Sequence, residues 1–256
     1  MVYGFFCMCH IVTLYGLWKF NFCYTEKISC MGVVVGYSGR PMTTLFKKLA
    51  DAEKVSHTLS APSKMPCYSY STPAKRCIVG MKMRSVEGSV CASCYACKGF
   101  YGFPDTQAAL EKRFQTLTDE LWEEAMVYLI GKKEKSGFFR WHDSGDLQGT
   151  WHLQKIVNIA NRLPHIKFWL PTREYSIVSQ WFRDGGIKPD NLTIRLSALM
   201  MDGEAPEAIA KRFNLVVSGV TKTEGYTCPA PNQENKCLEC RACWSQETYA
   251  INYKKH

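Results

Sequence analysis

Four cysteines near the C-terminus are spaced closely enough to bind a metal centre. Eight residues separate Cys228 from Cys237, and two residues separate each of Cys237, Cys240 and Cys243 from the next. Two-residue spacers let the backbone curl around an ion, so the four thiolates can converge. Separated Cys-x2-Cys pairs are typical of zinc, whereas a Cys-x2-Cys-x2-Cys run with a distant Cys-Pro is more typical of a 4Fe-4S cluster. We therefore expect an iron–sulfur cluster here, with zinc as the alternative.

A second group of cysteines precedes the regular part of the chain. Cys91 and Cys94 form a Cys-x2-Cys pair, and Cys77 can reach them through an intervening loop that contains Gly and Ser. Three thiolates would leave one iron of a 4Fe-4S cluster open for a substrate or cofactor. Cys97 could instead close the site as a fourth ligand, which would make it structural. Cys67 is expected to be a buried, small apolar residue.

Polar residues follow the first clear strand. His142, Asp143, Ser144, Gly145 and Asp146 form a turn directly after the apolar residues 138–141. Such a turn can hold a polar ligand, bind a metal through the imidazole and a carboxylate, or perform acid–base chemistry. The structural alternative is that the two aspartates only cap the following helix.

Charged residues accompany the next two strands. Arg173 follows an apolar strand, and its planar guanidinium could pair with a carboxylate or phosphate. An ion pair with Glu174 is the alternative. Arg195 lies within a strand and, if it points inward, needs a buried anionic partner.

Helical and strand patterns alternate through the middle of the chain. A helix is predicted to begin near Met42, with Leu45, Phe46 and Leu49 on one face. A long helix is expected from Asp105 to the lysines at 132–135. Strands are predicted at 138–141, 167–170, 192–196 and 215–220, and helices between them at 150–163, 175–182 and 205–213.

The connections between these strands are too long for hairpins, which predicts a parallel sheet and an α/β fold. We expect a partial parallel (β/α) barrel with Cys-rich metal-binding segments before and after it. In such folds the functional residues lie at the carboxyl ends of the strands.

Four regions follow from these patterns. Residues 1–41 are an atypical N-terminal extension, residues 42–104 a helix plus a Cys-rich loop, residues 105–225 the partial barrel, and residues 226–256 a Cys-rich metal-binding segment. The change in character at Met42 suggests that translation begins there and that the upstream part is a misassigned start. A signal anchor in the first eighteen residues is the alternative, although they lack a basic n-region and a small-residue cleavage site.

The composition favours a protein of a reducing compartment. The chain carries 13 cysteines among 256 residues, and disulfide scaffolds are mostly smaller and richer in loops. Lys and Arg outnumber Asp and Glu by 32 to 23, giving a net charge of +9. This excess is compatible with nucleic acid or a nucleotide as partner, or with solubility alone. No membrane partner is expected.

The motifs together resemble the phage "gene product 88" domain family. The resemblance is carried by Cys77, by Cys91-x2-Cys94-Tyr-Ala-x-Lys-Gly-x-Tyr, by His142-Asp-Ser-Gly-Asp and by the final Cys-x2-Cys-Arg-Ala-Cys-Trp. It extends from about Met65 to the C-terminus. The resemblance implies that the protein is located in the cytoplasm of a bacterial host, if it is phage-encoded. It does not imply any particular activity.

A weaker resemblance is to radical S-adenosylmethionine enzymes with a C-terminal auxiliary cluster. These are similar in layout: three cysteines precede a partial barrel, and a Gly-Gly-Glu-like motif follows the second strand. The resemblance implies that Cys77, Cys91 and Cys94 hold the reactive cluster and that Ser144, Gly145 and Asp146 position S-adenosylmethionine. Here 13 residues separate Cys77 from Cys91, and Asp replaces Glu.

The leading hypothesis is an iron–sulfur enzyme of this kind, with one or two clusters, acting on a nucleotide, nucleic acid or other small anionic substrate. His142, Asp143, Asp146 and Arg173 are its candidate catalytic residues. One alternative is a zinc-stabilised nucleic-acid-binding module without catalysis. Another is a transglycosylase- or hydrolase-like barrel that uses Asp143 or Asp146 directly.

Overall fold

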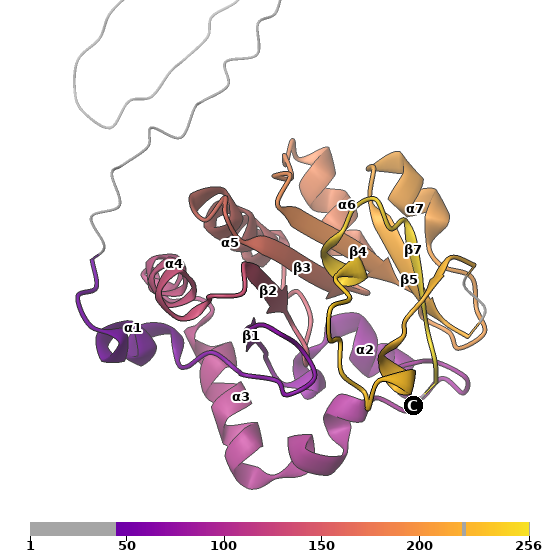
Figure 1. Ribbon diagram of the computed structural model, residues 1–256, viewed down its shortest axis with the longest axis horizontal. Helices are drawn as coiled ribbons and strands as arrows, with labels where there is room; N and C mark the ends of the chain where they lie inside the picture. Colours follow the sequence, from indigo (N-terminus) through magenta and orange to yellow (C-terminus); the bar gives the residue numbers. More distant parts are fainter. Residues whose placement is uncertain (1–44, 222–223, 256) are drawn as a thin grey trace, which may run out of the picture. The chain divides into compact units, whose positions relative to one another are not determined.

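A seven-stranded, all-parallel sheet forms the centre of the computed structural model, which describes residues 45–221 and 224–255 (Figure 1). Its strands lie in the order β1-β2-β3-β4-β5-β7-β6. They are β1 (Ser69–Tyr70), β2 (Phe138–Trp141), β3 (Lys167–Thr172), β4 (Leu192–Ser197), β5 (Val216–Val220), β6 (Tyr226–Thr227) and β7 (Ala250–Tyr253). The predicted α/β class and parallel sheet are therefore confirmed. The sheet is open and not closed into a barrel, with β1 and β6 at its edges.

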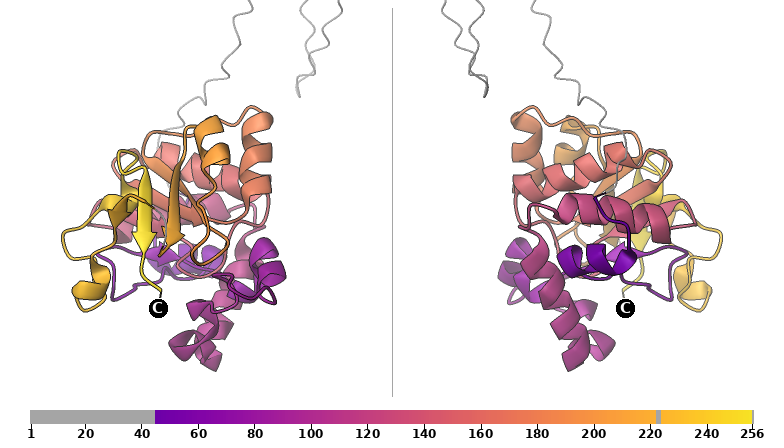
Figure 2. Two further views of the ribbon diagram at one scale, coloured as in Figure 1. Left: turned by 90° about the vertical axis from the view of Figure 1, so that its right-hand side faces the viewer. Right: turned by 90° about the vertical axis from the view of Figure 1, so that its left-hand side faces the viewer.

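Seven α-helices connect or flank these strands. They are α1 (Leu49–Ser56), α2 (Ile78–Met83), α3 (Pro104–Thr116), α4 (Trp122–Lys133), α5 (Thr150–Arg162), α6 (Tyr175–Arg183) and α7 (Glu207–Arg212). Helices α4 to α7 cover one face of the sheet. The C-terminal segment, which here means residues 228–249 between β6 and β7, covers the other (Figure 2). The turns η2 (Tyr95–Cys97) and η3 (Gly99–Gly102) belong to the Cys-rich loop that follows α2.

The period of two in β2 and β3 divides the core between the two faces. Phe139, Trp141 and Phe168 are completely buried in the main core with α4 and α5. Trp169 belongs to a second, smaller cluster with Trp244 of the C-terminal segment, and the two rings lie 5.2 Å apart, edge to face. The C-terminal segment is thus a packed layer of the fold.

Arg195 fastens this layer to the sheet. Its side chain is completely buried on β4, and its guanidinium nitrogens donate to five backbone carbonyls. The acceptors are those of Val217, Ala242, Ser245, Thr248 and Tyr249. The predicted anionic partner is not needed, because carbonyl oxygens supply the acceptors. Thr193 adds a hydrogen bond of 2.8 Å to the Trp244 carbonyl.

Several element boundaries differ from the prediction. The long helix expected from Asp105 is two helices, because the chain turns between α3 and α4, where the Asp119 carboxylate accepts from the Leu121 amide. Residues 45–48 are not helical, so α1 begins at Leu49, and Leu45 is 65 % exposed; the predicted start near Met42 lies outside the described residues. The predictions about residues 1–41 fall outside the described residues. Within residues 45–221 and 224–255, no helix is long and apolar enough to cross a membrane.

Candidate metal centre and active site

The thiols of Cys77 and Cys91 approach the same point beside α2. A Cβ atom built on Gly80 would lie 3.6 Å from the Cys77 Sγ and 3.7 Å from the Cys91 Sγ. It would also lie only 2.8 Å from the Cys77 Cβ, so a side chain at this position would press on that cysteine. The structure therefore brings together two of the three thiols that the sequence predicted as one site, and a glycine leaves them room.

Cys94 and Cys97 continue the same loop in two successive turns. The Cys94 amide donates to the Cys91 carbonyl at 3.3 Å, and the Cys97 amide donates to the Cys94 carbonyl at 3.2 Å. Burial raises the pKa of the Cys77, Cys91 and Cys94 thiols, and repulsion from neighbouring thiolates raises each of them further. The two-residue spacers thus curl the backbone as expected, and Cys97 lies close enough to Cys94 to raise its pKa.

Glu174 fixes the beginning of α2, directly after Cys77. Its Oε1 accepts a hydrogen bond of 2.8 Å from the backbone NH of Val79, while its buried Oε2 has no partner within the described part of the chain. The side chain is 1 % exposed, and burial raises its pKa to about 7. A carboxylate from the end of β3 therefore positions the cysteine of another element.

Asp146 is held at the ends of β2 and β3 by three donors. Its Oδ1 accepts from the Thr172 hydroxyl at 2.6 Å and the Leu147 amide at 2.8 Å, and its Oδ2 accepts from the Arg173 amide at 2.9 Å. Burial raises the pKa of Asp146, and these hydrogen bonds oppose the shift. The negative charge of Asp146 also raises the pKa of the nearby Cys77 and Cys91 thiols.

Arg173 lies beside this carboxylate without an ion pair to Glu174 in the described residues. Its Nε donates to the Ala198 carbonyl at 2.9 Å, and its charge lowers the pKa of Cys91 against the larger effect of burial. The side chain lies where β3 and β4 end, close enough for its charge to act on Cys91 of the cysteine loop. Of the two predicted roles, binding of an anionic group is compatible with this arrangement, whereas an ion pair with Glu174 is not seen in the described residues.

Asp143, Ser144 and Gly145 connect the turn after β2 to its neighbours. Asp143 accepts from Ser69 at 2.8 Å and from the Tyr101 hydroxyl at 2.6 Å, and its carbonyl accepts from the Tyr95 hydroxyl. Ser144 donates to the Thr72 carbonyl at 3.0 Å. Gly145 has φ +87, and a Cβ there would lie 2.0 Å from the Thr72 Oγ1. The close backbone approach that Gly145 permits is thus an approach to Thr72.

His142 is buried against a second histidine that sequence reasoning missed. The rings of His142 and His152 lie 5.2 Å apart, and none of their four nitrogens has a hydrogen-bond partner among the described residues. Burial lowers the pKa of His142 to about 3 and that of His152 well below its usual value. Both rings are therefore neutral at pH 7. His152 lies on the buried face of α5, so its helical position was the available signal.

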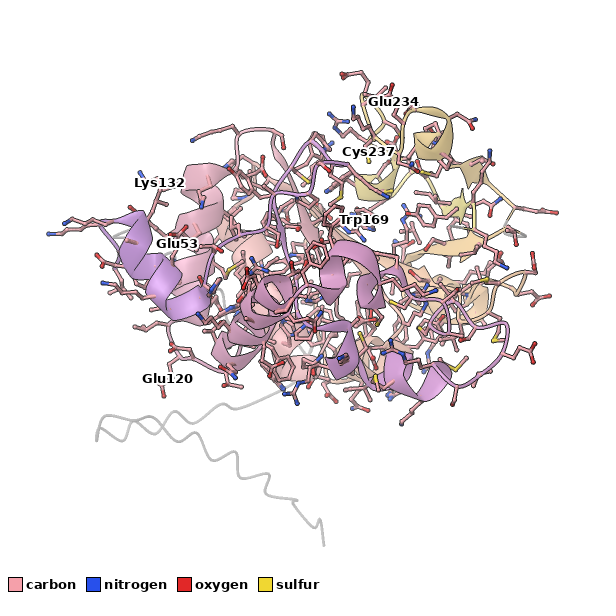
Figure 3. All side chains as sticks on the ribbon, turned by 90° about the horizontal axis from the view of Figure 1, so that it is seen from below. Glu53, Glu120, Lys132, Trp169, Glu234 and Cys237 are labelled. Carbon is pink, nitrogen blue, oxygen red and sulfur yellow. The ribbon has the colours of Figure 1, made fainter. Side chains whose placement is uncertain are left out.

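The C-terminal cysteines lie together on the other face of the sheet. The Cys240 amide donates to the Cys237 carbonyl at 2.9 Å, and electrostatic repulsion links Cys228 with Cys237, Cys240 and Cys243. Burial raises the pKa of Cys243 to about 12. Figure 3 shows Cys237 on the C-terminal segment, on the side of the sheet to which Trp169 belongs.

Two tyrosines of the last strands contact these thiols. The Tyr226 hydroxyl lies 3.3 Å from the Cys240 Sγ, and the Tyr253 hydroxyl lies 3.2 Å from the Cys243 Sγ. Cys67 is buried beside this group, as expected for a small apolar residue, and packs with Trp169 and Trp244. Strands β6 and β7 thus belong to the surroundings of the second cysteine group.

A family model described as gene product 88 matches residues 40–255. The chain belongs to the gene product 88 family. The match covers both cysteine groups and the turn after β2, so the whole geometry described above lies within the gene product 88 domain. No curated protein and no solved structure gives a significant match to the chain.

Arg140 lies between the two cysteine groups of this gene product 88 domain. Its guanidinium is 4.4 Å from the centre of the Trp169 ring, and one nitrogen is 3.5 Å from the Tyr95 hydroxyl of the cysteine loop. Although burial lowers the pKa of Arg140, the nearby Tyr95, Asp143, Tyr253 and Cys243 groups raise it more, so the net shift is upward. One cation therefore interacts with thiols of the second group and with Tyr95 of the loop that carries the first.

No set of three or more His, Cys, Asp or Glu side chains in residues 45–221 and 224–255 has the arrangement of a metal site. The donor chemistry of both cysteine groups nevertheless fits a thiophilic metal. All eight thiols are free and partly accessible, and they fall into two groups along the chain: Cys77, Cys91, Cys94 and Cys97 in one group, and Cys228, Cys237, Cys240 and Cys243 in the other. A metal ion binds the thiolate form, so binding at either group would release the protons of its thiols.

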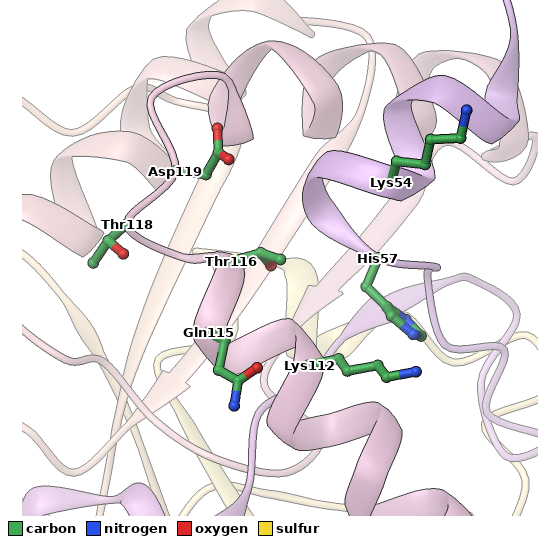
Figure 4. A pocket seen from close by; sticks show the side chains of 7 residues that line it. All are labelled: Lys54, His57, Lys112, Gln115, Thr116, Thr118 and Asp119. Atoms are coloured by element: carbon green, nitrogen blue, oxygen red, sulfur yellow. The ribbon is translucent and has the colours of Figure 1, made fainter.

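A surface hollow of about 380 Å³ lies elsewhere, between α1 and α3 (Figure 4). It is lined by Lys54, His57, Lys112, Gln115, Thr116, Thr118 and Asp119. None of the predicted site residues lines it. The hollow is therefore separate from the chemistry that the strand ends and cysteines suggest.

Proposed function

We propose that the protein is an iron–sulfur enzyme with a reactive centre at the strand ends and a second centre in the C-terminal segment. The observation that carries this proposal is the meeting of the Cys77 and Cys91 thiols beside Gly80, next to the carboxylates of Asp146 and Glu174. In parallel α/β folds the carboxyl ends of the strands are the usual place for a site.

Cys77, Cys91 and Cys94 would hold the reactive cluster, and Cys97 is the candidate fourth ligand. When bound through three thiolates, such a cluster supplies electrons and one open iron position, the combination that radical S-adenosylmethionine enzymes use. Glu174 keeps Cys77 at the start of α2, and Arg173 offers a guanidinium for an anionic group. Glu174 would thus position a cluster ligand, and Arg173 would position an anionic group of the substrate.

S-adenosylmethionine is the cofactor proposed for this site. The residue proposed to bind its amino group differs from the one that the sequence suggested. The acceptor oxygens of Asp146 already bind Thr172, Leu147 and Arg173, so they are occupied within the protein. The buried Oε2 of Glu174 has no partner in the described part of the chain. We therefore assign Glu174, rather than Asp146, to the amino group of the cofactor.

Cys228, Cys237, Cys240 and Cys243 would hold the second centre. They lie on the sheet face opposite α4 to α7, where Arg195 fixes the surrounding carbonyls. Four cysteine ligands leave no open position, which is typical of an auxiliary or structural site. Here the second centre would stabilise the layer that covers this face.

Metal analysis of anaerobically purified full-length protein tests the proposal. About eight iron and eight sulfide per chain are expected for two clusters, with about four lost in Cys94→Ser and about four lost in Cys240→Ser. Cys97→Ser distinguishes a three-ligand from a four-ligand site, because only the latter loses iron. Colourless protein with one or two zinc ions per chain would overturn the proposal and favour the zinc-stabilised module.

A further inference from the structure

Three exposed or half-exposed aromatic side chains lie in the cysteine loop and the residues after it. Tyr95, Phe100 and Phe103 are 49 %, 80 % and 55 % exposed. Phe100 and Phe103 pack edge to face against each other, with ring centres 5.4 Å apart. Large aromatic side chains are costly to expose, so a group of them indicates a binding surface. We call these three residues the aromatic knob.

The knob is connected to the turn after β2 through Tyr95 and through Tyr101, the neighbour of Phe100. Tyr95 donates to the Asp143 carbonyl, and the Tyr101 hydroxyl donates to the Asp143 Oδ2 at 2.6 Å. Tyr95 also lies next to Cys94 in the chain, and its ring contacts Tyr101 at 5.9 Å. A ligand on the knob would therefore be held beside the cysteine loop. Figure 2 shows that the segment with η3 and the start of α3 projects beyond the strand ends.

The segment that carries the knob has an excess of positive charge. Residues 75–112 contain six Lys or Arg and three Asp or Glu, and one of those acids, Glu111, is paired with Arg76 at 2.6 Å. Lys75, Lys82, Lys98 and Lys112 are exposed and form no salt bridge within the described residues. Of these, Lys98 lies two residues before Phe100 in the chain. Exposed aromatic rings with an unpaired lysine next to them match the chemistry of unpaired bases and phosphates.

We propose that the aromatic knob is a stacking platform for single-stranded nucleic acid, with Lys98 contacting its phosphates. Unpaired bases can stack on Phe100 and Phe103, whereas the bases of a duplex are already stacked. Binding would bring a strand to the reactive centre, and in this respect its purpose rests on the proposed function. Binding itself needs no metal, so apo protein and iron-loaded protein are both expected to bind.

Fluorescence anisotropy with a labelled DNA or RNA strand of about 20 nucleotides, and with the matching duplex, tests the platform. The full-length chain should prefer the single strand, and Phe100→Ala/Phe103→Ala should weaken its Kd at least about tenfold. Leu45→Ala/Ile187→Ala, which removes two exposed apolar side chains elsewhere, is the matched control and should leave Kd unchanged. Lys98→Gln should lower the slope of log K against log salt by about 0.7.

Equal binding of single strand and duplex, unaffected by the double phenylalanine variant, would overturn the platform. So would a concentration-dependent dimer that the same variant abolishes, because the knob would then bind a second copy of the chain. Loss of iron in Cys94→Ser with unchanged nucleic-acid binding would leave the platform intact. Iron loading with no nucleic-acid binding would leave the proposed metal chemistry intact, so the two can fail separately.

Discussion

The carboxylate of Glu174 accepts a hydrogen bond of 2.8 Å from the backbone NH of Val79, in the first turn of the helix that begins after Cys77. Through this contact the end of β3 holds a candidate metal ligand that lies about a hundred residues earlier in the chain. Amides at the beginning of a helix need an acceptor, and a buried carboxylate supplies a strong one.

Glu174→Ala is expected to lower the free energy of unfolding by about 1–3 kcal/mol, because the amides of α2 lose a buried acceptor. Glu174→Gln keeps an acceptor oxygen and should lose less. Urea denaturation measures both, and Glu120→Ala, which removes an exposed acid, serves as control and should stay within about 0.5 kcal/mol of wild type. An alanine variant as stable as wild type would show that the contact contributes nothing.

Gly145→Ala should be far more destabilising than Gly185→Ala. Both glycines have left-handed backbone angles, φ +87 and φ +89, so alanine costs each about 1–2 kcal/mol of backbone strain. Only at Gly145 would the new Cβ meet Thr72, at 2.0 Å from its Oγ1 and 2.8 Å from its carbonyl oxygen. We expect an additional loss of at least about 2 kcal/mol, measured by urea denaturation. Equal losses in the two variants would contradict the close packing of Thr72 against the turn.

The parallel sheet could be predicted because its central strands carry a local signal. Phe138–Trp141 and Leu192–Ser197 carry apolar residues at alternate positions and lie between amphipathic helices, and this pattern does not depend on distant residues. The edge strand β1 has only two residues, Ser69 and Tyr70, which is too short for any period. Its place in the sheet depends on pairing with Arg140 and Trp141, some seventy residues later.

The site could be predicted only in part, for a similar reason. Cysteine spacing located both thiol groups, and the turn from His142 to Asp146 lies at a strand end as expected. The capping role of Glu174 and the pairing of His142 with His152 arise from contacts between distant elements, which spacing along the chain does not encode. Arg195 illustrates the limit: the sequence placed it in a strand without deciding which way it points, and carbonyl acceptors replace the anion expected for an inward side chain.

Replacing Arg195 should loosen the C-terminal segment. Arg195→Met leaves several buried carbonyls without donors, and we expect a loss of at least about 3 kcal/mol in the free energy of unfolding. Cys243 should also react faster with a thiol reagent under native conditions, since the Ala242 and Ser245 carbonyls are no longer held. Arg183→Met, at an exposed position, is the matched control. Unchanged Cys243 reactivity would mean that the segment is held by other contacts.

The buried pair of His142 and His152 predicts a loss of stability in acid. In the unfolded chain both rings bind protons near pH 6.5, whereas burial lowers the pKa of His142 to about 3 in the folded protein and that of His152 well below 6.5. The unfolded state therefore binds more protons below pH 6.5, and the pair's contribution to stability is lost as pH falls. Each ring contributes a slope of up to about 1.4 kcal/mol per pH unit.

His152→Phe isolates this effect, because neither ring nitrogen of His152 has a partner to lose among the described residues. Urea denaturation between about pH 4 and pH 7 should show an acid slope smaller by about 1.4 kcal/mol per pH unit than in wild type. His165→Gln, at an exposed position, should keep the wild-type slope. If His152→Phe also kept the wild-type slope, His152 would have to accept a proton in the folded protein, and a buried neutral pair would be ruled out.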